Sequence, residues 1–151
     1  MTNNSVEIIP ASKKDIPQLI GLLQHLFSIE KDFIFDEKKH QRGLELLLET
    51  PNSVILTARV NKKIVGMVTL QTLVSTAVGE KVGLIEDFVI NEAFHNQTIG
   101  SQLFEALTTY AKQHHLARLQ LVCDNDNTNA KKFYTKKGFN PSNLSAWYWS
   151  R

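Results

Sequence analysis

The stretch Asn127-Thr-Asn-Ala-Lys-Lys-Phe-Tyr134-Thr-Lys-Lys-Gly138-Phe139 carries the strongest local pattern in the sequence. Asn127 is typical of a helix N-cap, and Gly138 is typical of the residue just beyond a helix. Between them, Ala130, Phe133 and Tyr134 stand at i, i+3 and i+4, so they share one helical face. The stretch therefore predicts one short helix, from about residue 128 to 136, that presents a phenol.

A second informative stretch lies earlier in the chain: Glu86-Asp-Phe-Val-Ile-Asn-Glu-Ala-Phe-His95-Asn-Gln-Thr98-Ile-Gly100. It reads as an apolar strand that passes through a turn into an amphipathic helix. At such a junction, backbone N–H groups and the positive end of the helix dipole point toward the turn and favour an anion. The two stretches together predict a phosphate site with a phenol beside it.

These residues resemble the GCN5-related N-acetyltransferase family, which moves the acetyl group of acetyl-CoA to an amine. The family has Arg or Gln, two residues, Gly, one residue and Gly at the start of its central helix. It then has Asn-x-x-Ala-x-x-Phe-Tyr-x-x-x-Gly-Phe, which this chain matches fully at Asn127, Ala130, Phe133, Tyr134, Gly138 and Phe139. The first pattern is matched in part, because His95 replaces Arg or Gln and Thr98 replaces the first Gly. The order of elements agrees over nearly the whole chain, and the run from Leu84 to Ile90 looks most like diamine and polyamine acetyltransferases.

The resemblance implies acetyl-CoA as cosubstrate, bound largely through the backbone. The pantetheine would pair with the strand edge at Phe88, Val89 and Ile90. The cofactor-binding turn and its surroundings would comprise His95, Asn96, Gln97, Thr98, Ile99, Gly100 and Ser101, with Asn127 and Tyr134 from the second stretch. Thr98 weakens this binding only if its position requires a positive φ or a very close phosphate, because a β-branched residue is strained there. An ordinary helix start is the alternative interpretation of the turn.

Proton transfer in such a reaction needs an acid for the leaving thiolate and a base for the attacking amine. Tyr134 is the expected acid, because a phenol gives its proton to a thiolate at a cost of only about 2 kcal/mol. Its alternative role is that of a packed aromatic. Glu86 and Asp87 interrupt an apolar strand, and strand alternation sends them to opposite faces. The resemblance favours Glu86 as the base, directly or through water, while a buried structural hydrogen bond is the alternative for either carboxylate.

Composition limits the classes of function. The chain has 151 residues, 42% hydrophobic and 21% charged residues, and a formal net charge of +2, which is ordinary for one soluble domain. The charge is too small to indicate nucleic acid or membrane as a partner. The single Cys123 excludes an internal disulfide and suits a reducing compartment. No signal peptide or membrane span is apparent, so the expected location is cytoplasmic. The histidines lack metal-ligand spacing, and no metal is expected.

Periodicity and turn residues predict the order of elements. Strands are expected at 6–9, 54–60, 64–73, 82–90, 119–123 and 144–149. Helices are expected from a cap at Asp15 to about residue 27, and at 37–49, 98–114 and 128–136. This order predicts an α/β (α+β) fold of the GNAT type, in which a mixed, mostly antiparallel central sheet is flanked by helices on both faces. One domain, residues 1–151, is expected.

The sequence therefore indicates an N-acetyltransferase that acts by direct transfer on a primary amine, either a small molecule or a peptide. A non-catalytic CoA-binding or regulatory domain, and a protein N-terminal or lysine acetyltransferase, are the alternatives. Acidic residues between the first two expected helices, Glu30, Asp32, Asp36 and Glu37, either attract a cationic acceptor or form a solvated loop. Trp147 and Trp149 share one face of the last expected strand, which indicates packing or a homodimer contact.

Overall fold

The computed structural model describes residues 5–95 and 98–151, and their contacts divide the chain into two compact units. The first unit ends at Gln120, and the second runs from Leu121 to Arg151. The single domain expected from chain length stays a prediction.

The first unit contains a five-stranded sheet in the order β1-β2-β3-β4-β5. The strands are β1 (Val6–Pro10), β2 (Ser53–Val60), β3 (Lys63–Ser75), β4 (Glu80–Ile90) and β5 (Leu119–Gln120). The pairs from β1 to β4 are antiparallel, and β4 pairs with β5 in parallel. This is the mixed, mostly antiparallel sheet that the sequence predicts.

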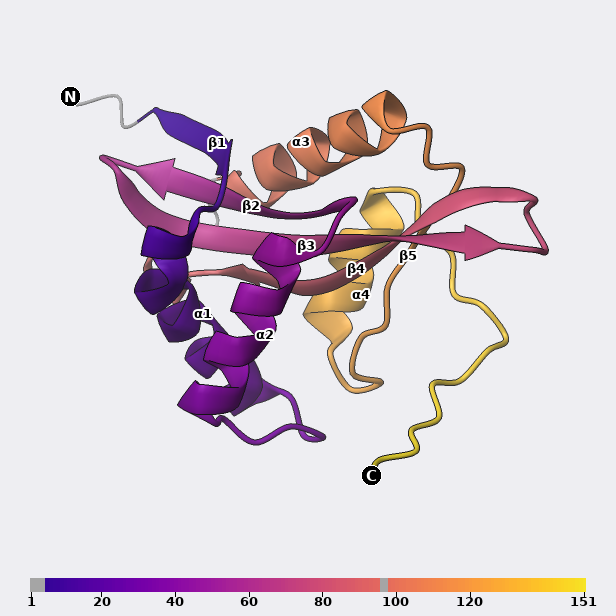
Figure 1. Cartoon of the computed structure of the whole chain (residues 1–151), viewed down its shortest axis with the longest axis horizontal. Coiled ribbons are helices and arrows are strands. Elements are labelled where there is room, and N and C mark those ends of the chain that lie inside the picture. Colours follow the sequence, from indigo (N-terminus) through magenta and orange to yellow (C-terminus); the bar gives the residue numbers. More distant parts are fainter. Residues whose placement is uncertain (1–4, 96–97) are drawn as a thin grey trace. The chain divides into compact units, whose positions relative to one another are not determined.

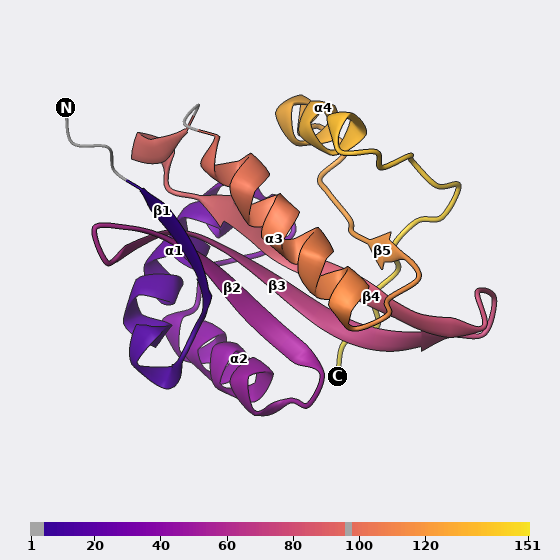
Figure 2. The ribbon, with the colours of Figure 1, turned by 90° about the horizontal axis from the view of Figure 1, so that it is seen from above.

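Helices cover both faces of this sheet (Figures 1 and 2). A turn of 3₁₀ helix (Lys13–Asp15) leads into α1 (Ile16–Ile29), which is followed by α2 (Glu37–Glu49); a second 3₁₀ turn (Glu92–Phe94) precedes α3 (Ile99–Gln113). The helices α1 and α2 lie on one face and α3 lies on the other. The alternation of strand side chains supplies a core to each side.

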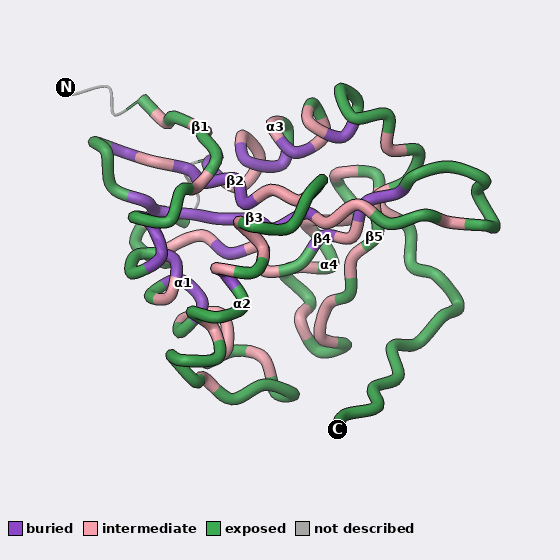
Figure 3. The backbone as a smooth tube through the Cα atoms, viewed as in Figure 1, coloured by how far each residue is buried: buried purple, intermediate pink, exposed green. Residues whose placement is uncertain are grey.

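Buried residues lie along the strands and along the helices that cover them (Figure 3). Leu19, Leu44 and Met67 belong to the cluster between α1, α2 and the sheet. Ala58, Val65 and Ile99 belong to the cluster beneath α3. Since Ile99 is the first residue of α3 and is 2% exposed, the core fixes the start of this helix as well as its middle.

The cap expected at Asp15 is only partly correct. Asp15 occupies the N-cap position of α1, but its side chain makes no capping hydrogen bond there. Instead, its carboxylate accepts hydrogen bonds from the backbone N–H and hydroxyl of Ser12 and lies 2.8 Å from Nη2 of Arg59 on β2. Asp15 therefore ties the start of α1 to the sheet.

The second unit contains α4 (Thr128–Lys136) and an extended C-terminal segment. The expected strand at 144–149 is wrong, because this segment has no strand structure, and the expected strand at 119–123 is shortened to Leu119–Gln120. Trp147 and Trp149 are 91% and 89% exposed. Strand propensity alone does not form a strand; the backbone must also find a pairing partner.

Candidate functional site

The middle of β4 contains an irregularity that sequence periodicity does not reveal. Met67 on β3 pairs with Val89 and Thr69 pairs with Glu86, so Asp87 and Phe88 together face the single residue Val68. This is a β-bulge, and Asp87 within it has a φ of +52°. Bulges bend a strand and redirect its side chains. Here the bulge lies at the two carboxylates that the sequence singles out.

The two neighbouring carboxylates differ in environment. Glu86 is exposed, whereas Asp87 is partly buried, with its carboxylate beside the hydroxyl of Thr69 on β3. The pKa of Asp87 is raised from 3.8 to about 6. Burial is the largest cause and the charge of Glu86 adds to it, while the hydrogen bond from Thr69 acts in the opposite direction. Thr69 is itself a partner that the sequence pattern did not identify, because a lone threonine in an apolar strand gives no signal.

The backbone edge of β4 is largely outside the ladder with β5. The parallel register covers only Gly83 and Leu84. Phe88, Val89 and Ile90, the residues expected to pair with pantetheine, follow later in the strand. Val89 is buried against the α1 side of the sheet, so the backbone and not this side chain is what the strand can offer a ligand.

The anion site is expected in the turn after β4. His95 lies with Nε2 2.9 Å from the carbonyl oxygen of Ile90; since a carbonyl only accepts, this nitrogen is the donor. That donor is therefore engaged with the strand, and Nδ1 is the ring atom left for another contact. Asn96 and Gln97, also expected in this site, lie outside the described residues.

Thr98 is the N-cap of α3 in a left-handed conformation, with φ +63° and ψ +6°. Its hydroxyl does not cap the helix and instead accepts a hydrogen bond from the Gln102 side chain at 3.2 Å. The first hydrogen bond of the helix joins the N–H of Gln102 to the carbonyl of Thr98. The N–H groups of Ile99, Gly100 and Ser101 consequently have no carbonyl partner within the helix, which fits an anionic group at this end.

The second unit presents Tyr134 on α4 as the sequence predicts. Asn127 caps this helix, since its Oδ1 accepts the N–H of Ala130 at 3.0 Å. Gly138 ends it with a φ of +92°, and the N–H of Phe139 bonds the Tyr134 carbonyl across the turn. The Tyr134 ring makes edge contacts with Phe133 and Phe139, at centroid distances of 5.5 and 5.7 Å. The ring is thus held by its neighbours within the unit.

The acidic connection between α1 and α2 has a partly structural role. Asp36 caps α2 by accepting the N–H of Lys39, and that backbone hydrogen bond is the main reason why its pKa lies below the ordinary value. The N–H of Asp36 in turn donates to Nε2 of His40, whose ring packs between Phe27 and Phe35. Asp36 is therefore a helix cap, and an acceptor-binding role for the other acids of this connection stays a prediction.

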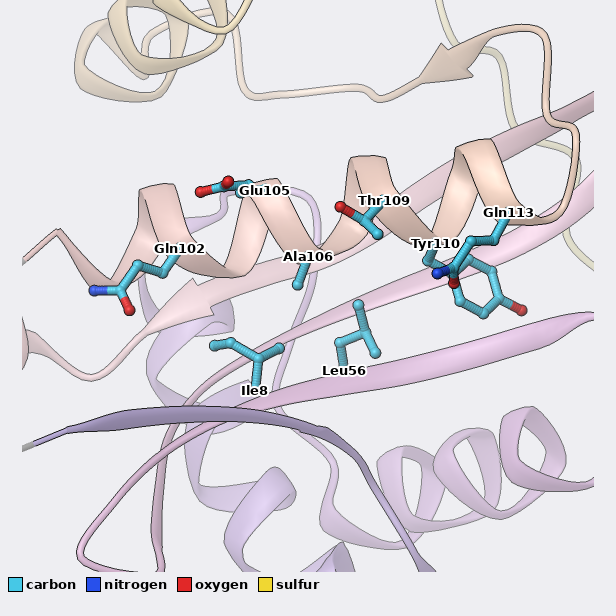
Figure 4. A pocket seen from close by; sticks show the side chains of 8 residues that line it. All are labelled: Ile8, Leu56, Gln102, Glu105, Ala106, Thr109, Tyr110 and Gln113. Atoms are coloured by element: carbon cyan, nitrogen blue, oxygen red, sulfur yellow. The ribbon is translucent and has the colours of Figure 1, made fainter.

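A shallow groove of about 450 Å³ runs along α3 on its β1 side (Figure 4). Ile8, Leu56 and Ala106 form its apolar floor, and polar side chains from α3 surround it. None of the expected site residues that the structure describes lines it. Among the described residues there is no group of His, Cys, Asp and Glu that could hold a metal ion. None of the helices in that part of the chain is both long and apolar enough to cross a membrane.

The sequence is similar to that of known acetyltransferases. The sequence profile of the acetyltransferase (GNAT) family matches residues 20–139. An uncharacterised N-acetyltransferase from the pepI 3' region of Lactobacillus delbrueckii subsp. lactis is 30% identical over 146 residues, which cover 88% of this chain and 83% of the relative.

Solved structures share the fold. The aminoglycoside N-acetyltransferase AAC(6')-Iy in complex with CoA has a TM-score of 0.80 at 16% identity, over 97% of this chain and 95% of that one. A transcriptional regulator from Bacillus halodurans C-125 has a TM-score of 0.82 at 22% identity, over 97% of this chain and all of that one. Both structures have the α/β fold predicted from the sequence, although one is named as an acetyltransferase and the other as a transcriptional regulator.

Proposed function

The chain belongs to the acetyltransferase (GNAT) family, and from this premise we propose that it transfers an acetyl group from acetyl-CoA directly to a primary amine. The observation that carries the proposal is the start of α3. The N–H groups of Ile99, Gly100 and Ser101, which have no carbonyl partner within the helix, form a backbone anion site beyond the turn that follows the bulged strand, and such a site suits a pyrophosphate.

Bound acetyl-CoA supplies the activated acetyl group as a thioester. Residues Thr98 to Ser101 hold its pyrophosphate, and the edge of β4 at Phe88 to Ile90 holds its pantetheine. Glu86, exposed at the bulge, holds the acceptor ammonium and assists its deprotonation, directly or through water. Tyr134 gives a proton to the departing sulfur. The diamine and polyamine resemblance supports a cationic acceptor.

A charge reversal at the start of α3 tests the cofactor site. Ser101 is the third residue of the helix, where a glutamate is favourable to the helix dipole. Ser101→Glu should therefore keep or raise the melting temperature while weakening acetyl-CoA binding at least tenfold by calorimetry, because its carboxylate repels the pyrophosphate. Ser101→Gln is the matched neutral control. If the two variants bind acetyl-CoA with equal affinity, the pyrophosphate does not bind at this turn.

An amine screen tests the reaction itself. Acetyl-CoA is mixed with 1,4-diaminobutane, spermidine, glucosamine, an aminoglycoside or a lysine-containing peptide, and release of the CoA thiol is followed. Saturable thiol release with formation of the acetylated amine supports the proposal, and the best substrate distinguishes a small-molecule from a peptide acetyltransferase. If acetyl-CoA binds at micromolar concentration without transfer to any of these amines, the non-catalytic alternative is favoured. The imperfect match to the family pattern, with His95 in place of Arg or Gln and Thr98 in place of the first Gly, is the observation that supports this alternative.

A further inference from the structure

The hydroxyl of Thr69 stands between two acceptors on β4. Its oxygen lies 2.8 Å from the carbonyl oxygen of Glu86, to which it donates, and 3.3 Å from Oδ2 of Asp87. A hydroxyl has a single proton, so it cannot donate to both. The shorter contact is the ordinary length for such a bond, and the Asp87 contact is longer.

The surrounding structure fixes these groups. Thr69 is 1% exposed on a central strand, and the bulge with its positive φ turns Asp87 toward it. Glu86, one residue earlier, is exposed. The pair therefore consists of one exposed carboxylate and one partly buried carboxyl group that contacts a hydroxyl.

The two protonation states of Asp87 require different orientations of Thr69. When Asp87 is protonated, its O–H donates to Oγ1 of Thr69, and Thr69 donates to the Glu86 carbonyl. When Asp87 is ionised, the Thr69 hydroxyl turns to the carboxylate, and the Glu86 carbonyl loses that donor. A proton arriving on Asp87 is thus accommodated by rotation of one hydroxyl group.

We propose that Asp87 is the group that finally holds the proton lost by the acceptor ammonium, and that Thr69 is the positioning residue that accommodates it. The proposal rests on the proposed transferase function. An N–H bond of the ammonium breaks, its electron pair stays on nitrogen, and an O–H bond forms on the Asp87 carboxylate. Glu86 is the carboxylate that faces the acceptor, and Asp87 later returns its proton to water.

The chemistry favours Asp87 over an ordinary carboxylate. An alkylammonium has a pKa of about 10, so a carboxylate near 4 is a very weak acceptor. With a pKa raised from 3.8 to about 6, Asp87 takes the proton on the order of a hundredfold more favourably than an ordinary aspartate and is still ionised at neutral pH. The charged group that acts on Asp87 is Glu86, and the other influences are burial and the Thr69 hydrogen bond.

A carboxyl ¹³C NMR titration of the full chain, without ligand, tests the charge state. The Asp87 signal, assigned with Asp87→Asn, should titrate near pH 6. Thr69→Val removes the hydroxyl that bonds Asp87 in both protonation states. Because the bond to the ionised carboxylate is charge-assisted and therefore the stronger of the two, the midpoint should move upward by about half a pH unit or more, while Thr69→Ser restores it. Thr57→Val is the matched control: Thr57 is equally buried, but its hydroxyl donates to Ile9. A midpoint near 4, or one that Thr69→Val does not move, would overturn the proposal.

The pH dependence of kcat/KM tests the catalytic role with the best amine of the screen. The midpoint of the acid limb should agree with the NMR midpoint of Asp87 and should shift with it in Thr69→Val, but neither should shift in Thr57→Val. Asp87→Asn should lower kcat about 10²-fold or more. If acetyl transfer occurs but the midpoint of its acid limb is the same in Thr69→Val as in the parent, this proposal is overturned while the transferase function stands. No transfer by any variant would instead overturn the function, and the proton acceptor with it.

Discussion

Replacing Thr98 with glycine tests whether the start of α3 is strained. Thr98 has φ +63°, where a β-branched residue costs roughly 1–2 kcal/mol relative to glycine. Glycine also gains freedom in the unfolded chain, which offsets about 0.4–1 kcal/mol, and the variant loses an exposed hydrogen bond with Gln102. The expected net gain is about 0.5–1 kcal/mol, equivalent to a rise in Tm of roughly 1–4 °C.

The effect on acetyl-CoA affinity should be smaller than the effect on stability. Since Thr98 already has the left-handed conformation without a ligand, its strain belongs to the folding free energy and not to binding. Calorimetry should therefore give a dissociation constant within about threefold of the parent. His115→Gly is the matched control, because His115 has φ +55° at the other end of α3. If Thr98→Gly lowers Tm while His115→Gly raises it, or if affinity rises more than about tenfold, the reasoning about strain is refuted.

Three further variants test separate parts of the site. Asp87→Asn should be more stable than the parent by up to about 3 kcal/mol above pH 7 and about equally stable at pH 4. The raised pKa of Asp87 means that the folded parent is stabilised while Asp87 is protonated, and this stabilisation is lost as the pH rises from 3.8 through about 6. Urea unfolding at both pH values measures the difference. Tyr134→Phe should lower kcat by a factor of roughly 10²–10⁴ with unchanged acetyl-CoA affinity and Tm, whereas the control Tyr110→Phe on α3 should leave kcat unchanged. If Tyr134→Phe has the same kcat as the parent, Tyr134 is a packed aromatic and not the acid. Asn127→Ala should destabilise α4 by about 1 kcal/mol, because the N–H of Ala130 loses its capping partner. Amide exchange in that helix should become faster, and unchanged exchange would contradict the role of Asn127 as a cap.

Sequence periodicity predicted the elements whose formation depends on local signals. The helix from Thr128 to Lys136 begins and ends where Asn127 and Gly138 indicate, because a side-chain cap and a left-handed glycine act within one turn. The strands β2 to β4 and the helix α3 agree within two residues at most boundaries for the same reason. In contrast, the segment 144–149 has the aromatic content of a strand but no pairing partner, and composition cannot supply one.

The site was predictable in its residue types but not in its geometry. Alternation placed Glu86 and Asp87 on opposite faces, but their environments are set by the bulge opposite Val68. That irregularity depends on the register between β3 and β4, which is a tertiary property. Thr69 was missed for the same reason, since only the register brings it beside Asp87. Likewise, the sequence predicted strain at Thr98 only if that residue had a positive φ, and only the structure shows that it does.

The positions of backbone strain support a functional role for this part of β4 and α3. Non-glycine residues with positive φ among those described are Asn52, Asn61, Lys62, Asp87, Thr98 and His115. Asn52, Asn61 and Lys62 lie in turns and His115 follows a helix, where such conformations are ordinary. Asp87 lies within a strand and Thr98 begins a helix, so neither conformation is required by its element. Strain that the local structure does not require is retained when something else depends on the resulting geometry. Here it turns a carboxyl group toward Thr69 and starts α3 from a left-handed residue, which are the two features that the proposed reaction uses.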